Sequence, residues 1–194
     1  MGDMKMGPQE KKERTSDGKE RIVLGEGNWL RLVSEGTWEF AERRRVSGVV
    51  VIIAVTDDEK LVMVEQYRPA LKKKVIELPA GLAGDEEHFK GEALAEAARR
   101  ELIEETGYEA GQIEPLLEGP TSSGMASEVI TLFRASHLKR ISDGGGDDKE
   151  NIVVHEVPLI ELYAWTRRMA KVGRLIDPKV FSGAYFAEHP TIED

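Results

Sequence analysis

Residues 48–55, with the sequence GVVVIIAV, limit the fold more than any other segment of this chain. The run is almost continuously β-branched, which predicts a strand buried on both of its faces. The turn TDDEK leads from it into a second apolar strand, LVMVEQYR, at 61–68. A third strand is expected at 75–80, VIELPA, ended by Pro79 and Gly81. The core is therefore expected to form around these strands.

Helices are expected in the second half of the chain. Residues 92–106 lack Pro and Gly, are rich in Ala, Leu, Glu and Arg, and precede Gly107, a common helix stop. Leu94, Ala98 and Leu102 recur at every fourth position as a buried stripe. Beyond this helix, the pattern predicts strands at 113–119, 128–136 and 151–159, an amphipathic helix at 159–172 and a short last helix after Pro178.

The chain divides into three parts by composition. Residues 1–20 hold few apolar side chains and are expected to form a mobile polar tail. Residues 21–45 alternate apolar and polar positions around a turn at Gly36, which predicts a small antiparallel β-sheet. Residues 46–194 are then expected to form the main domain.

The charge balance limits the possible partners. The formal net charge of −9 argues against sequence-independent binding to nucleic acid or to anionic membranes. A phosphate-bearing substrate would therefore need a local basic group or a metal ion. The absence of cysteine excludes disulfides, zinc–thiolate sites and thiol nucleophiles. No apolar run approaches the ~18 residues of a membrane span, and no signal-peptide core is present, so a cytoplasmic protein is expected.

An acidic cluster lies in the second half of the helix expected at 92–106. Glu101 and Glu105 are i,i+4 neighbours of like charge, which costs an isolated helix roughly 0.2–0.5 kcal/mol, and Glu104 is close to both. A divalent cation such as Mg²⁺ would compensate for this repulsion, because hard ions bind carboxylate oxygens. A solvated acidic face is the alternative that the helix alone leaves open.

Residues 77–108, ELPAGLAGDEEHFKGEALAEAARRELIEETGY, resemble the Nudix box of the Nudix hydrolases. In that family a Gly is followed after five residues by Glu, and after seven more by Arg-Glu-apolar-any-Glu-Glu-any-Gly-apolar. Glu92 and the run from Arg100 to Tyr108 fit these positions. Gly81 precedes Glu92 by ten residues instead of five, which implies a five-residue insertion before the helix. Glu87 keeps the family spacing from Gly81 but lies too far from Arg100.

Other segments extend the resemblance to one branch of the family. VEQYRPA, IELPAG, the loop EGPTSSGMASE and the late strand VHEVPL are similar to enzymes that hydrolyse ADP-ribose and other nucleoside diphosphate sugars. The resemblance implies an α/β fold, an α/β/α sandwich around a mixed β-sheet. It also implies that the small N-terminal antiparallel sheet forms a homodimer with exchanged elements.

The resemblance assigns roles to the residues of the box. It implies that Glu101, Glu104, Glu105 and the backbone carbonyl of Ala80 bind Mg²⁺, with Mn²⁺ as an alternative metal. Arg100, Glu92 and Gly81 take the supporting positions of the family motif, where a guanidinium orients carboxylates by paired hydrogen bonds. A helix ion pair between Arg100 and Glu96 is the plain alternative for Arg100.

Five further residues are candidates outside the box. Arg68 matches a substrate-phosphate arginine of the branch. Glu150, in the glycine-rich segment 143–150, is the candidate general base on a closing loop, and Glu128 is the second candidate base or a metal helper. Trp38 and Phe40 could stack on a nucleobase across a dimer interface. The alternatives are a surface arginine, solvated charges and a core aromatic pair.

The expected reaction is hydrolysis of a pyrophosphate bond in a nucleoside diphosphate sugar, with ADP-ribose first among the substrates. Two other functions remain open. One is a module that senses ADP-ribose without hydrolysing it, although such domains usually lose box carboxylates that are all present here. The other is a Nudix enzyme for dinucleoside polyphosphates, oxidised nucleotides or RNA ends, of which the acidic composition disfavours RNA.

Overall fold

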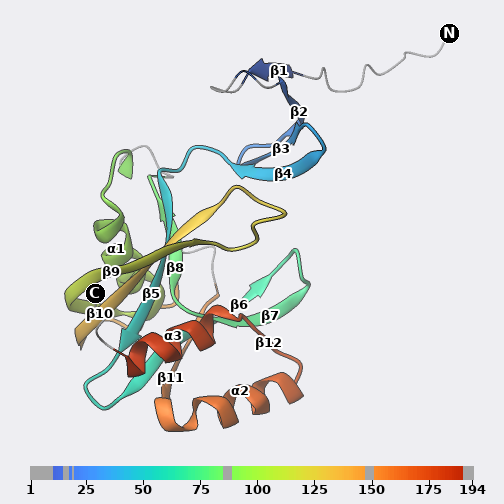
Figure 1. Ribbon diagram of the computed structural model, residues 1–194. Helices are drawn as coiled ribbons and strands as arrows, with labels where there is room; N and C mark the ends of the chain where they lie inside the picture. Colours follow the sequence, from blue (N-terminus) through green and yellow to red (C-terminus); the bar gives the residue numbers. More distant parts are fainter. Residues whose placement is uncertain (1–10, 15–17, 19, 85–88, 147–150, 190–194) are drawn as a thin grey trace. The chain divides into compact units, whose positions relative to one another are not determined.

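The computed structural model describes residues 11–14, 18, 20–84, 89–146 and 151–189, and the chain divides into two compact units (Figure 1). The smaller unit comprises residues 1–46 and 119–130, and the larger unit comprises 47–118 and 131–194. Residues 119–130 join the smaller unit through backbone hydrogen bonds. The N–H of Ala41 donates to the carbonyl of Met125 at 2.8 Å, and the N–H of Ser127 donates to the carbonyl of Ala41 at 3.0 Å. The sequence did not predict this long-range pairing.

The smaller unit contains a four-stranded antiparallel sheet in the order β1-β2-β3-β4. Its strands are β1 (Lys11–Arg14), β2 (Glu20–Glu26), β3 (Leu30–Glu35) and β4 (Trp38–Arg43). Gly36, with φ of 61°, makes the turn between β3 and β4 where the sequence predicts one. Strand β1 is a correction to the expected tail, because residues 11–14 pair with β2 instead of extending as irregular chain.

The larger unit contains an eight-stranded mixed sheet in the order β12-β7-β6-β5-β10-β9, with β11 beside β6 and β8 beside β5. Strand β12 is parallel to β7, whereas β6 is antiparallel to β5, β7 and β11. The strands are β5 (Gly48–Val55), β6 (Lys60–Arg68), β7 (Lys73–Glu77), β8 (Ala80–Ala83), β9 (Tyr108–Pro120), β10 (Val129–Arg140), β11 (Val153–Pro158) and β12 (Leu175–Ile176).

One expected strand is divided in the structure. The segment 75–80 forms the end of β7 and the start of β8, with Leu78 and Pro79 between them. Proline lacks the N–H that a central strand needs, so the chain leaves β7 at this point and pairs next with β5. The change of partner places Ala80 and Gly81 at the start of β8.

Helices cover both faces of the larger sheet, as the apolar run at 48–55 requires. Val50 and Ile52 of β5 pack with Leu102 of α1 (Leu94–Thr106) in the main core cluster. Val51 and Ile53 alternate with them and are also almost fully buried, on the face where α3 (Lys179–Glu188) contacts β5 and β6. The α/β architecture with a mixed sheet is thus confirmed.

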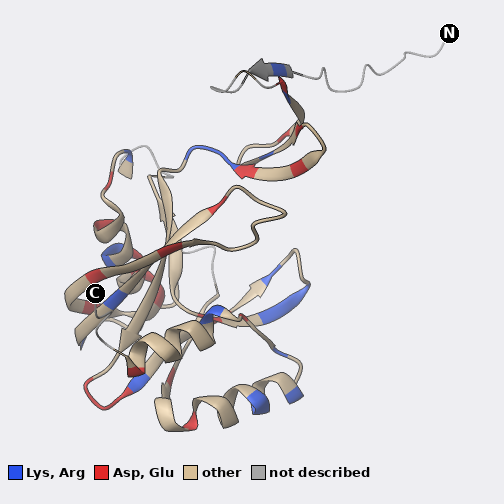
Figure 2. Ribbon diagram, in the orientation of Figure 1, with Lys and Arg blue, Asp and Glu red and all other residues tan. Residues whose placement is uncertain are grey.

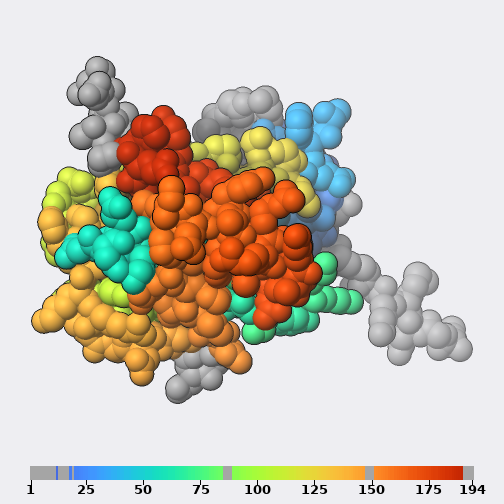
Figure 3. Space-filling model, turned by 90° about the horizontal axis from the view of Figure 1, so that it is seen from below, coloured from blue at the N-terminus to red at the C-terminus, as the bar shows by residue number. Residues whose placement is uncertain are grey.

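A further helix lies near β11 and β12. The short 3₁₀ turn Leu159–Glu161 leads into α2 (Leu162–Lys171), which contacts both strands. Helix α2, in orange, forms much of the face seen in Figure 3. Within the residues that the structure describes, no helix is both long enough and apolar enough to cross a membrane.

Candidate active site

Helix α1 carries the acidic cluster and begins two residues later than the sequence predicts. Ala93 caps the helix in an extended conformation, and the preceding Gly91 has a φ of 83°, so Glu92 lies just before the first turn. The helix ends at Gly107, whose φ is 76° and whose N–H donates to the carbonyl of Ile103 at 2.8 Å.

Arg100 is the organising cation of this cluster. Its Nε and Nη2 donate to the two carboxylate oxygens of Glu92 at 3.2 and 3.3 Å. Its Nη1 donates to Glu101 at 2.8 Å and to Glu104 at 3.1 Å, and Nη2 also donates to the carbonyl of Leu82 at 3.0 Å. These five bonds use the five N–H donors of a guanidinium.

The surroundings of Arg100 strengthen these contacts. Its side chain is only 16% exposed, and those of Glu92 and Glu101 are 10% and 14% exposed. Burial alone would lower the pKa of Arg100, but the hydrogen bonds that it donates to Glu92, together with the charge of Glu101 and the hydrogen bond donated to it, raise the pKa above its ordinary value. The alternative partner expected from the sequence, Glu96, instead lies 3.9 Å from Arg99.

Glu105 lies on the side of α1 that faces β8. Its side chain is buried, and one of its carboxylate oxygens accepts a hydrogen bond from the N–H of Ala80 at 3.0 Å. Gly81 packs against the neighbouring carboxylate, because a Cβ at this position would lie 1.9 Å from the carboxylate carbon of Glu101. The start of β8 therefore touches two of the three glutamates expected to bind metal.

The donor chemistry of this cluster suits a hard divalent cation. Three carboxylates, those of Glu92, Glu101 and Glu104, pair with the guanidinium of Arg100, and Glu105 on the same helix adds a fourth, so the formal charge of the cluster is strongly negative. In the described part of the chain, no three carboxylate or imidazole groups converge closely enough to hold a metal ion as they stand. The side chain of Glu104 is 48% exposed and has room to reorient toward its neighbours. These residues fit a magnesium ion by charge and ligand type.

The glycine run from Gly144 to Gly146 contacts the C-terminal end of this helix. Gly145 donates its N–H to the carbonyl of Glu105 at 2.9 Å, and Gly146 donates to that of Glu104 at 3.0 Å. The φ values of Gly144, Gly145 and Gly146 are 67°, 112° and 82°, which suit glycine. Gly144 packs closely against this helix end, because a Cβ at its position would lie 2.4 Å from the backbone carbonyl carbon of Thr106.

Glu150, the candidate base, lies outside the described residues. The ends of its segment are joined, because the N–H of Ile152 donates to the carbonyl of Gly145 at 3.2 Å. Gly145, which precedes the undescribed residues 147–150, also donates a hydrogen bond to the carbonyl of Glu105 near the C-terminal end of α1.

Arg68 lies at the end of β6 and is held by a carboxylate of β7 that the sequence pattern does not single out. Its Nε donates to Glu77 of β7 at 2.7 Å, and its side chain is 42% exposed. The hairpin between β6 and β7 also carries Lys72, Lys73 and Lys74, and Figure 2 shows Lys and Arg gathered there. The larger unit thus carries a local group of basic residues at this hairpin.

The other three candidates belong to the smaller unit. Glu128 accepts a hydrogen bond from Nε of Arg43 at 2.6 Å and is 19% exposed. Trp38 is 63% exposed, whereas Phe40 is half-buried beneath the guanidinium of Arg21, 5.7 Å from its ring centroid. The two aromatic residues therefore have different surroundings.

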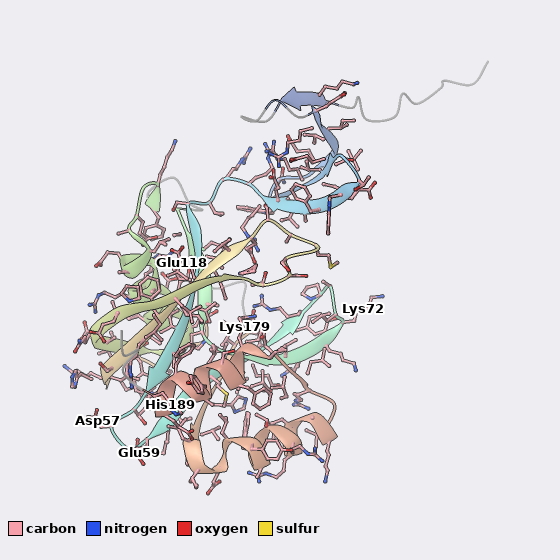
Figure 4. The ribbon with its side chains drawn as sticks, in the orientation of Figure 1. Asp57, Glu59, Lys72, Glu118, Lys179 and His189 are labelled. Atoms are coloured by element: carbon pink, nitrogen blue, oxygen red, sulfur yellow. The ribbon has the colours of Figure 1, made fainter. Side chains whose placement is uncertain are left out.

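Charged residues elsewhere on the larger unit have structural partners. Lys179, at the start of α3, donates to Asp177 at 2.5 Å, and Glu118 of β9 accepts a hydrogen bond from Thr131 at 3.3 Å. Figure 4 shows these side chains on separate elements, with Lys72 at the tip of the β6–β7 hairpin.

A second buried carboxylate ties the sheet together. Glu65 of β6 lies 3.0 Å from Nζ of Lys74, 3.4 Å from Arg174 and 3.3 Å from Nε2 of His155. Burial alone would raise the pKa of Glu65, but the hydrogen bonds from these three residues lower the pKa below its ordinary value. The carboxylate of Glu65 therefore links β6 to β7, to β11 and to Arg174, the residue directly before β12.

Comparison with known proteins identifies relatives of this chain. The family model described as NUDIX domain matches residues 45–176. A GDP-mannose pyrophosphatase of Citrobacter koseri is 34% identical over 143 residues, which cover 70% of each chain. An ADP-ribose pyrophosphatase of Bacillus subtilis is 38% identical over 113 residues, 58% of each chain.

Two further comparisons concern coverage and fold. A methanol dehydrogenase activator of Bacillus methanolicus is 44% identical over 118 residues, 61% of this chain and 59% of that protein. The chain therefore spans about three fifths of the length of the Bacillus relatives. A crystal structure of an ADP compounds hydrolase aligns with a TM-score of 0.60 and 19% identity, covering 83% of this chain and 86% of the other, which supports the fold.

Proposed function

The chain belongs to the Nudix family, and from this membership we propose that it is a Mg²⁺-dependent hydrolase of nucleoside diphosphate sugars. Water would attack one phosphorus of the pyrophosphate, the bridging P–O bond would break, and a nucleoside monophosphate and a sugar phosphate would leave. The observation that carries this proposal is the array of carboxylates ordered by Arg100 beside Ala80 and Gly81. ADP-ribose is the substrate that we place first.

The residues of the cluster would have two roles, metal binding and the positioning of the metal ligands. Glu101, Glu104, Glu105 and the carbonyl of Ala80 would hold Mg²⁺, or Mn²⁺ in its place, and the ion would supply charge neutralisation at the phosphoryl oxygens. Arg100 would keep Glu101 and Glu104 in position through its hydrogen bonds. Its contact with Glu92 would fix the guanidinium itself.

Substrate contacts would come from outside the helix. Arg68 would bind a phosphate, with Glu77 orienting its guanidinium at 2.7 Å. Glu150 would act as the general base that accepts a proton from the attacking water, and Glu128 is the second candidate for this step. Trp38 and Phe40 would stack on the nucleobase across a dimer interface. We place this enzyme in the cytoplasm, without nucleic-acid or membrane partners.

A substrate panel tests the proposed reaction. The protein with Mg²⁺ would be incubated with ADP-ribose, ADP-glucose and GDP-mannose, and release of phosphomonoesters would be measured. A dinucleoside polyphosphate and an oxidised nucleoside triphosphate serve as comparison substrates. We expect hydrolysis of at least one sugar nucleotide, with ADP-ribose preferred, and loss of activity when a chelator removes the metal.

The panel also separates the alternatives. Tight binding of ADP-ribose without hydrolysis would favour a sensing module, and preference for a comparison substrate would favour another Nudix activity. Either result would reject the proposed reaction.

We also propose a homodimer formed through the smaller unit. Its sheet and the turn before β3 expose Trp29, Leu30, Leu32 and Trp38 by 44 to 63% of their surfaces, and such apolar groups are typical of interfaces that hide them from water. Sedimentation at micromolar concentration should give the mass of two chains. Trp38→Asp should shift the protein toward monomer, whereas Tyr185→Asp on α3, an exposed aromatic in the larger unit, should not. A monomeric parent protein would reject the dimer.

A further inference from the structure

The connection between β8 and α1 brings an aromatic ring to the candidate active site. This connection holds the five residues by which the chain exceeds the usual spacing of the Nudix box. Phe89 lies in this connection, and its ring centroid is 4.3 Å from the guanidinium carbon of Arg100. The carbonyl of Phe89 also accepts a hydrogen bond from the N–H of Glu92 at 2.9 Å. Phe89 therefore touches the organising arginine and fixes the backbone of its carboxylate partner.

The position of this ring matters because of how Arg100 is bonded. The guanidinium directs its hydrogen bonds within its own plane, toward Glu92, Glu101, Glu104 and the carbonyl of Leu82. The two faces of the plane carry no N–H donors, and Phe89 covers one of them. An aromatic face attracts a cation, more strongly where water is excluded.

We propose that Phe89 is a positioning residue of the candidate active site, which holds Arg100 in the orientation that presents Glu101 and Glu104 to a divalent ion. This inference rests on the proposed metal-dependent function. The ring restrains rotation of the guanidinium and keeps water from its face. The in-plane hydrogen bonds to the carboxylates are then held in one geometry, which lowers the cost of ordering them when the metal binds.

Replacement of the ring separates this role from simple packing. Phe89→Leu keeps an apolar side chain of similar bulk but removes the π face, whereas Phe89→Tyr and Phe89→Trp keep that face. We expect Phe89→Leu to weaken binding of Mn²⁺ about three- to tenfold, in line with the strength of a shielded cation–π contact, and the aromatic variants to stay within about twofold of the parent.

The primary measurement is calorimetric titration of Mn²⁺ into the full-length protein without substrate. Thermal unfolding without metal shows whether each variant is folded, and the Mg²⁺ concentration that gives half-maximal hydrolysis is a second readout. Turnover at saturating Mg²⁺ should change less than about threefold, since Phe89 does not contact the reacting groups in this proposal. Phe181→Leu, on α3 and 45% exposed, is the matched control and should leave metal binding unchanged.

The outcomes distinguish this inference from the proposed function. Unchanged Mn²⁺ binding in Phe89→Leu, with the parent still binding metal and hydrolysing substrate, would overturn the role of Phe89 alone. Equal losses in Phe89→Leu, Phe89→Tyr and Phe89→Trp would overturn it also, because the π face would then be irrelevant. A parent protein that neither binds Mn²⁺ nor hydrolyses any sugar nucleotide would overturn both proposals.

Discussion

Glu105→Gln should lower the rate of pyrophosphate hydrolysis at least ~100-fold while leaving the protein folded, because charge stabilisation by a bound metal is worth several kcal/mol at a reacting phosphoryl group. The amide keeps the shape of the carboxylate, and its carbonyl oxygen can still accept the hydrogen bond from the N–H of Ala80. The change therefore removes one negative charge from a buried position with little loss of packing.

The matched control for Glu105→Gln is Glu96→Gln on the same helix. The side chain of Glu96 is 68% exposed and pairs with Arg99, so the same chemical change should leave the rate within about twofold. We expect Glu105→Gln without metal to melt at an equal or slightly higher temperature than the parent, because one like-charge pair with Glu101 is removed. Near-normal Mg²⁺-dependent turnover in Glu105→Gln would refute the metal role of this carboxylate.

Glu150→Gln should lower the catalytic rate by about 10²–10⁴-fold, with little effect on thermal stability or on substrate affinity. A general base must come within ~3 Å of the attacking water. Gly145 and Gly146, which precede Glu150 in the chain, donate hydrogen bonds to the carbonyls of Glu105 and Glu104 at the end of α1. Rates would be measured at saturating Mg²⁺ and substrate.

Glu128→Gln is the companion variant to Glu150→Gln. Its carboxylate is bonded to Arg43, so its replacement should affect the smaller unit, which melting will report, more than the chemical step. If Glu150→Gln leaves the catalytic rate unchanged and Glu128→Gln lowers it strongly, Glu128 is the general base instead of Glu150. If neither variant changes the catalytic rate, the attacking water must be activated by the metal and the helix carboxylates.

The sequence predicted the parts of this fold that depend on periodic patterns. The buried run at 48–55 became β5, covered by helices on both faces, and the stripe of Leu94, Ala98 and Leu102 became the core face of α1. The Nudix resemblance is confirmed by the family model over residues 45–176. Glu92, which the resemblance places in the box, makes a bidentate contact with Arg100.

The contacts made by Phe89 and by Glu128 could not be predicted from a periodic pattern in the sequence. Phe89 lies in a connection, where an aromatic residue could equally face solvent, and its contact with Arg100 depends on the course of the chain around Gly91. Arg43 and Glu128 are 85 positions apart, so their ion pair follows from the pairing of β4 with residues 125–127. Pro79 could have signalled the division between β7 and β8, since proline cannot supply the ladder N–H.

The contact between β8 and α1 has a consequence for chain entropy. The hydrogen bond from Ala80 to Glu105 closes 25 positions of chain, whereas the pair of Glu65 and His155 joins residues 90 positions apart. The entropic cost of closing a loop grows with the logarithm of its length. The shorter loop therefore costs about 1 kcal/mol less to close. Strand β8 and helix α1, whose contact brings Ala80 and Gly81 to the acidic cluster, are thus joined at lower entropic cost than β6 and β11, and they lie within a single short interval of the chain.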